Sequence, residues 1–166
     1  MNLILALFVF TQFLYAKEGC DDTGKYYREC ADQEKLFSHA FEKARDSKRS
    51  LLILVGADYC PGCKQLHKAF EQEPLKSQIG KEFDFVKISR VLGREKNPSG
   101  EAVMDRLMMI TKAPQKPKGY PLLVFLNPVG GKGVFLNLQA TSSKKTGFDP
   151  QKLSAEISKS QEYLGH

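Results

Sequence analysis

The 166-residue sequence contains no tryptophan, only three histidines, and no charged side chain in its first sixteen residues. It has no internal repeat and no glycine-rich phosphate-binding motif. Gly130-Gly131 is followed neither by a phosphate-loop lysine nor by the G-x-G-x-x-G spacing, so this pair is expected in a turn. No segment has the pattern of a nucleic-acid-binding module. These absences argue against repeat proteins, nucleotide-binding folds and nucleic-acid partners.

The composition is that of one globular domain. Hydrophobic residues make up 42% of the chain and charged residues 27%, so enough apolar mass is present to bury a core. The length suits a single compact domain rather than several. The net charge of +6 permits anionic partners. Lysines spread along amphipathic helices usually form a solvated surface, however, and we expect the lysines of this chain to do the same.

The uncharged N-terminal segment is expected to be a signal peptide. Thirteen of residues 1–16 are apolar, and the small residue Ala16 precedes the first charge at Lys17. Two features depart from an ordinary signal peptide. Leu14, at position −3 from a cleavage site after Ala16, is larger than the usual small residue, and the segment does not begin with a lysine or arginine. An uncleaved anchor is the alternative, but sixteen helical residues span about 24 Å against a bilayer core of roughly 30 Å. We therefore expect a periplasmic or otherwise secreted protein that is not stably inserted in the membrane after cleavage.

Four cysteines remain in the mature chain, at positions 20, 30, 60 and 63. An even number in an exported chain indicates disulfides, and the spacing favours Cys20 with Cys30 and Cys60 with Cys63. Closing the short loop between Cys20 and Cys30 would stabilise the fold by up to roughly 3 kcal/mol. A four-thiolate zinc site is the competitor, but the nine residues between Cys20 and Cys30 fit it poorly.

After the leader, we expect a polar extension over residues 17–31 and one folded domain over residues 32–166. Within the domain, apolar periodicity and capping residues predict helices over residues 32–47, 61–73, 75–79, 102–110 and 149–164. Strands are predicted over residues 50–57, 83–88, 122–126 and 134–138. The first strand is continuously apolar, as a central strand covered on both faces requires. The order predicts an α/β layer with mixed strand directions.

The pair Cys60 and Cys63 carries the chemistry. The two residues follow the apolar strand and open the next helix, where one turn brings i and i+3 together. Free N–H groups and the positive end of the helix dipole stabilise a thiolate there. Cys60, nearer the helix end, is expected to be the attacking sulfur, and Cys63 the one that resolves a mixed disulfide.

Four segments together resemble the thioredoxin superfamily, and exported thioredoxin-like proteins in particular: LLILVGADYC, CPGCK, FVKIS and GYPLLVFLNPVGG. The resemblance implies a thioredoxin-like fold with a central mixed β-sheet flanked by helices. It implies a redox-active disulfide and no other cofactor. Cys60 matches the nucleophile, Cys63 the resolving cysteine and Pro121 the cis-proline beside the disulfide. Substrate contacts are expected at Tyr59, Pro61, Gly62 and Tyr120.

The sequence departs from the family pattern in three places. Leu54 stands where thioredoxins have a buried carboxylate that helps move the proton of the resolving thiol. Lys87 matches a family lysine beneath the site and is a candidate for proton-transfer support, with an ordinary strand lysine as the alternative. Pro61-Gly62 reverses the usual order of these two residues, which alters the donors that reach the thiolate. Third, the span between Cys63 and Pro121 is longer than in compact thioredoxins. The extra residues lie over 90–119, and the last of them form a basic Pro/Lys-rich loop over residues 111–119, which is expected near the site, either solvated or as a docking surface.

The leading hypothesis is an exported thiol–disulfide oxidoreductase. Its partners would be protein thiols and disulfides, together with a membrane or soluble redox partner that resets it, and the chain is expected to be a monomer without a metal. The first alternative is a metal-binding or metal-delivering module that uses Cys60, Cys63 and His67. The second is a thioredoxin-fold interaction protein whose disulfide is only structural.

Overall fold

The computed structural model describes residues 20–143 and 147–165. The predicted signal peptide over residues 1–16 lies outside the described residues and stays a prediction. The described residues form five α-helices: α1 (Gln33–Asp46), α2 (Pro61–Phe70), α3 (Leu75–Glu82), α4 (Pro98–Thr111) and α5 (Pro150–Leu164). The strands are β1 (Ser50–Gly56), β2 (Phe83–Ser89), β3 (Val91–Leu92), β4 (Glu95–Lys96), β5 (Leu122–Asn127), β6 (Lys132–Phe135), β7 (Ser142–Ser143) and β8 (Gly147–Phe148).

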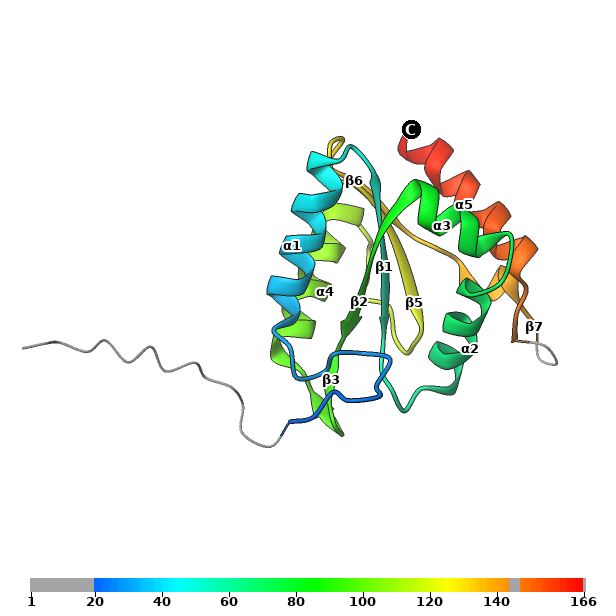
Figure 1. The fold of residues 1–166 in the computed structure, drawn as a ribbon. Helices are drawn as coiled ribbons and strands as arrows, with labels where there is room; N and C mark the ends of the chain where they lie inside the picture. Colours follow the sequence, from blue (N-terminus) through cyan, green and yellow to red (C-terminus); the bar gives the residue numbers. More distant parts are fainter. Residues whose placement is uncertain (1–19, 144–146, 166) are drawn as a thin grey trace, which may run out of the picture.

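A four-stranded sheet with the order β2-β1-β5-β6 forms the centre of the domain. Strand β1 pairs with β2 in parallel and with β5 in antiparallel, and β5 pairs with β6 in antiparallel. Helices α1 and α4 cover one face of this sheet, and α2, α3 and α5 cover the other (Figure 1). The prediction of an α/β fold with a central mixed sheet flanked by helices is therefore confirmed.

Strand β1 is buried along its whole length because it has a packed layer on each side. Leu51, Ile53 and Val55 point into the layer with α1 and α4, where Phe37 and Leu107 lie. The alternate residues of β1 point into the layer with α2, α3 and α5. A strand that is covered on both faces needs apolar residues at every position, which accounts for the continuous apolar run.

The helix starts follow from local capping. The carboxylate of Asp32 accepts hydrogen bonds from the N–H groups of Glu34 and Lys35, and Asp149 caps α5 in the same way. These side chains satisfy N–H groups that have no partner within the helix. The predictions that Asp32 and Asp149 begin helices are confirmed.

Several predicted boundaries are wrong. Helix α3 continues through Gly80 to Glu82, because Gly80 keeps a helical backbone here and the chain becomes extended only at Phe83. Strand β6 spans Lys132–Phe135 rather than residues 134–138, because the chain leaves the sheet and forms a 3-10 turn over Leu138–Thr141.

The stretch over residues 90–100, predicted as a polar connection, contains the β3–β4 hairpin and the first turn of α4. Asn97 caps α4 through hydrogen bonds from the N–H groups of Ser99 and Gly100. Strands of two residues have no alternation that a sequence pattern could reveal. The start of α4 is hidden because its first turn, Pro98-Ser99-Gly100, is polar and contains glycine.

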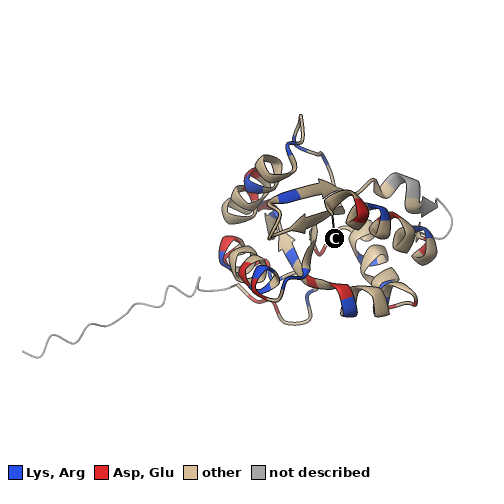
Figure 2. Ribbon diagram, turned by 90° about the horizontal axis from the view of Figure 1, so that it is seen from above, with Lys and Arg blue, Asp and Glu red and all other residues tan. Residues whose placement is uncertain are grey.

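Charged residues of both signs are interspersed on the outer helices (Figure 2). Among the residues that the structure describes, no helix is both long and apolar enough to cross a bilayer.

Candidate functional site

A disulfide between Cys60 and Cys63 lies at the start of α2. Cys60 is the N-cap residue, and its Sγ accepts a hydrogen bond from the Cys63 N–H at 3.1 Å. The buried strand β1 delivers the chain to this point, and Pro61 occupies the first helical turn, where a missing N–H costs nothing. Cys60 is 7% exposed and Cys63 1% exposed, so Cys60 is the more exposed of the two cysteines.

A cis peptide bond between Tyr120 and Pro121 precedes β5 and faces this disulfide turn. A β-carbon placed on Gly62 would lie 3.1 Å from Pro121 Cδ, closer than nearly all real contacts of that kind. The glycine between the cysteines therefore allows the proline ring to pack directly against the turn. The structure thus brings together the CPGC motif and Pro121, which are far apart in the sequence.

A groove of about 400 Å³ begins at the cis-proline. Its lining includes Tyr120 and Pro121 on one side, Leu136 and Leu138 beyond the end of β6, and Lys118 at the rim. Tyr59, on the outer side of the disulfide turn, is 60% exposed. The groove beside the cis-proline is therefore lined mainly by aromatic and apolar residues.

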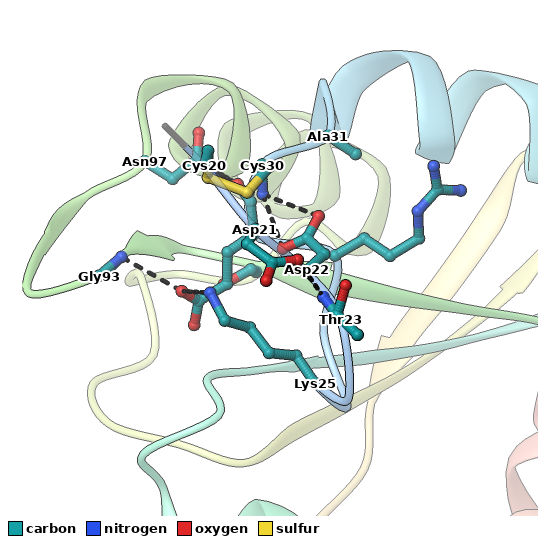
Figure 3. Close-up of a disulfide and its surroundings, with 12 residues drawn as sticks. Cys20, Asp21, Asp22, Thr23, Lys25, Cys30, Ala31, Gly93 and Asn97 are labelled. Carbon is teal, nitrogen blue, oxygen red and sulfur yellow. Dashed lines mark hydrogen bonds and ion pairs between the residues drawn. A yellow bond between two sulfur atoms is a disulfide. The ribbon is translucent and has the colours of Figure 1, made fainter. Parts of the chain in front are cut away.

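The N-terminal extension is tied down by a second disulfide, which pairs Cys20 with Cys30 as the spacing favoured. Figure 3 shows this disulfide with the carboxylate of Asp22, which accepts a hydrogen bond from the Cys30 N–H. The extension is also linked to the β3–β4 hairpin: the carboxylate of Glu29 accepts a hydrogen bond from the Gly93 N–H at 3.1 Å and pairs with Lys25.

The same extension contacts the active-site end of β1. Asp58, two residues before Cys60, accepts hydrogen bonds from the N–H groups of Tyr26 at 2.7 Å and Tyr27 at 3.3 Å. Its own N–H donates to Glu29 at 3.5 Å. Asp58 is thus the partly buried anchor of the extension.

Tyr27 is the residue at the site that sequence reasoning missed. Its side chain is 2% exposed, and its hydroxyl lies beside Gly56 and Cys63. Burial, with the charge of Asp58 as a second cause, raises the pKa of the Tyr27 hydroxyl. The polar extension carries no periodicity that would mark this one tyrosine as buried.

Lys87 lies on β2, directly across from Leu54 in the sheet register. Burial lowers the pKa of Lys87, and the charges of Asp58 and Glu71 oppose that shift. Its Nζ lies 5.9 Å from the centre of the Tyr26 ring, so the lysine is in the layer between the sheet and the extension. Leu54 is fully buried and supplies no ionisable group.

His67, one turn beyond Cys63, faces Tyr26 and Glu71. Its ring packs edge-on against Tyr26 with centroids 4.8 Å apart, and its Nε2 lies 3.4 Å from the Glu71 carboxylate. Within residues 20–143 and 147–165, no three histidine, cysteine or acidic side chains are grouped as metal ligands. The four cysteines form two separate disulfides and are not gathered into one four-thiolate cluster.

The basic loop over residues 111–119 ends beside the site, as expected, but part of its charge is neutralised. Lys116 pairs with Glu101 at 2.9 Å and with Asp105 at 2.8 Å, both on α4. Glu101 also binds Arg90, whose guanidinium lies over the Tyr120 ring at 5.6 Å. The cluster of Arg90, Glu101 and Lys116 thus holds the segment that leads into the cis-proline.

This cluster gives a pH-dependent prediction. The hydrogen bond from Arg90, supported by Lys116 and opposed by burial, holds the pKa of Glu101 at about 2, below its ordinary 4.5. A depressed carboxyl pKa contributes stability above the ordinary value, and this contribution is lost as the pH falls from 4.5 towards 2. Glu101→Gln should cost about 1–2 kcal/mol at pH 7 and flatten this part of the stability curve, as measured by urea unfolding. Asp105→Asn, at an exposed partner of Lys116, is the control and should change stability by less than about 0.5 kcal/mol. An unchanged acid limb in Glu101→Gln would contradict the assignment.

The sequence matches a known protein family, and the fold matches solved structures. The model of a family described as thioredoxin-like matches residues 32–128, more than half of the chain. No curated protein matches the sequence significantly. Among solved structures, a disulphide isomerase from Xylella fastidiosa Temecula1 superposes with a TM-score of 0.63 at 19% identity, covering 82% of this chain and 97% of that one. A structure described as DsbH oxidoreductase superposes with a TM-score of 0.50 at 20% identity, covering 77% and 81%.

Proposed function

Because the chain belongs to the thioredoxin-like family, we propose that it is a thiol–disulfide oxidoreductase that exchanges disulfides with protein substrates through Cys60 and Cys63. The observation that carries the proposal is the Cys60 sulfur at the N-cap of α2. It accepts the Cys63 N–H and is the more exposed member of a disulfide that lies against a cis-proline. The two solved structures described above are named as a disulphide isomerase and an oxidoreductase, which supports this class of reaction.

The exchange has two steps. In the reduced protein, the Cys60 thiolate attacks one sulfur of a substrate disulfide, and the other substrate sulfur leaves with the electron pair and takes a proton. Cys63, after losing its proton, then attacks Cys60 Sγ. The bond between Cys60 and the substrate breaks, and the second substrate sulfur leaves as a thiol. The protein is oxidised to the Cys60–Cys63 disulfide and the substrate is reduced; oxidation of substrate dithiols follows the reverse order.

The N-cap position favours the first step. A sulfur at this position meets free backbone N–H groups and the positive end of the helix dipole, which stabilise the thiolate over the thiol. Pro61 has no N–H, so it removes one donor next to Cys60. The Cys63 N–H is the donor that the structure places on the Cys60 sulfur.

The substrate segment is proposed to lie across Pro121 and Tyr120, with Tyr59 and the turn over Pro61 and Gly62 on its other side. The exposed Tyr59 and the close approach of Gly62 to Pro121 support this path, and the groove beside the cis-proline offers an apolar lining for the residues that flank a substrate cysteine. Lys87 is proposed to support proton transfer through its charge beneath the site. Its side chain is half-buried and lies in the layer between the sheet and the extension. No cofactor other than the disulfide is needed for this reaction.

We further propose that the protein works outside the cytoplasm as a monomer and is reset by a membrane or soluble redox partner. The second disulfide supports export, because a disulfide between Cys20 and Cys30 persists in oxidising compartments and is rare in the cytosol. The uncharged apolar leader over residues 1–16 has the composition of a cleaved signal peptide.

The test is a trapping experiment with a disulfide-bonded model substrate and matched cysteine variants. Cys63→Ser retains the attacking sulfur but cannot resolve, so it should accumulate a mixed disulfide that dithiothreitol releases. Cys60→Ser should form none and should leave turnover at the uncatalysed rate. Non-reducing electrophoresis and mass spectrometry of the adduct locate the attacked cysteine. Equal trapping by both variants, or a wild-type disulfide that never exchanges, would overturn the proposal.

A further inference from the structure

The hydroxyl of Tyr27 lies next to the inner sulfur, at the end of β1. A β-carbon built on Gly56 would lie 2.7 Å from Cys63 Sγ and closer still to the Tyr27 hydroxyl oxygen. The hydroxyl and the sulfur are therefore neighbours across the space above Gly56. The absence of a side chain at Gly56, the last residue of β1, is what allows them to share it.

This hydroxyl is buried and has no hydrogen-bond partner within the described residues while the disulfide is closed. A buried hydroxyl without a partner is unfavourable, so natural structures seldom keep one without a reason. Opening the Cys60–Cys63 bond would create such a partner, because a free Cys63 thiolate is a charged acceptor and a disulfide sulfur is a poor one.

We propose that Tyr27 is a positioning residue for the resolving step, whose O–H donates a hydrogen bond to the Cys63 thiolate in the reduced and mixed-disulfide states. This inference rests on the proposed function. The donated bond favours the ionised form of Cys63, the form that attacks Cys60 Sγ. The proton that Cys63 releases passes to water, and the leaving substrate sulfur takes one up, so the step balances without another reactant.

The surroundings keep the hydroxyl in its donor form. Burial and the nearby charge of Asp58 raise the pKa of the Tyr27 hydroxyl, so it stays protonated throughout the range in which a thiol titrates. A donor is needed here because Leu54 places only a hydrocarbon on the central strand beneath the site.

Other charges face the same region from three elements. Asp58 follows β1 and binds the extension, Lys87 comes from β2, and His67 and Glu71 lie on and just after α2. Glu29 of the extension contacts the Asp58 N–H. These groups set the background on which Cys63 titrates, and they are unchanged by removal of one hydroxyl. The effect of Tyr27 can therefore be isolated by Tyr27→Phe, which keeps the ring.

The experiment follows one turnover of the reduced protein, with its Cys20–Cys30 disulfide intact, against 5,5′-dithiobis(2-nitrobenzoate). Attack by Cys60 releases one thionitrobenzoate in a first phase, and attack by Cys63 on the mixed disulfide releases a second. In Tyr27→Phe the first phase should be unchanged. The second should be about tenfold slower at pH 7, with its pH midpoint raised by about one unit.

Tyr26→Phe is the matched control, since it removes a hydroxyl from the neighbouring, more exposed residue of the same loop and should alter neither phase. A purely structural role of Tyr27 would leave the pH midpoint of the second phase in place, and that result would overturn the inference. Absence of the first phase in the wild-type protein would instead overturn the proposed function. The first phase also reports whether Tyr27→Phe has kept an intact site.

Discussion

Replacement of Gly100 by alanine should destabilise the domain by about 3 kcal/mol, although alanine is the better helix former. Gly100 lies in the first turn of α4 and is buried against the end of β2. A β-carbon there would overlap the Ser89 carbonyl oxygen and lie 2.9 Å from Arg90 Cα. Both are backbone atoms, so the helix itself must move away. Chemical denaturation of the purified variant measures the loss.

The matched control is Gly80→Ala in α3. Gly80 is also helical, but it is exposed and a β-carbon on it would meet nothing within 4 Å. The same substitution should therefore stabilise the protein by about 0.5–1 kcal/mol, through helix propensity alone. Equal changes in the free energy of unfolding at the two glycines would contradict the close contact between α4 and the end of β2. A displaced α4 would also carry Glu101 with it and loosen the segment that leads to Tyr120.

Removal of the N-terminal disulfide by the double replacement Cys20→Ser and Cys30→Ser should cost about 3 kcal/mol. The bridge closes a loop of sequence separation 10, which restricts the unfolded chain. In the folded protein this loop carries Tyr26 and Tyr27 onto Asp58. The thermal midpoint should fall, and limited proteolysis should cut first within the loop, because local opening needs less free energy there.

Asp21→Asn serves as the control for this second prediction. Asp21 lies in the same loop, and its carboxylate accepts hydrogen bonds from Thr23, two residues further along the chain. It should leave the thermal midpoint and the cleavage pattern unchanged. A double-serine variant as stable and as protease-resistant as wild type would mean that the extension is held by its hydrogen bonds alone.

Much of the fold could be predicted because its determinants are local. The caps at Asp32 and Asp149 act on N–H groups two or three residues away, so they can be read without knowledge of the rest of the chain. The continuous apolar run of β1 reports burial on both faces, whichever helices cover them. The short hairpins could not be predicted, because two-residue strands such as Val91–Leu92 carry no alternation.

The candidate site also has a part that local sequence predicts and a part that it does not. Cys60 and Cys63 could be assigned from sequence because their meeting needs only one helical turn, which the preceding strand and Pro61 predict. Pro121 could be placed beside them only through the family resemblance, since its distance along the chain gives no information about contact. The structure shows that the Tyr120–Pro121 peptide bond is cis and that Gly62 fits against the proline ring.

By itself, the sequence determined the alternation of helices and strands, the central position of β1, and a cysteine pair at the start of α2. Each of these depends on interactions within a few residues or on a repeat of side-chain polarity. Only the tertiary structure decided that the extension belongs to the site. The bonds that place it there join residues far apart in the chain: 64 positions separate Glu29 and Gly93, and 32 separate Tyr26 and Asp58. Such contacts form only when the folded chain brings distant segments together, and the polar extension has no local sequence pattern that predicts them.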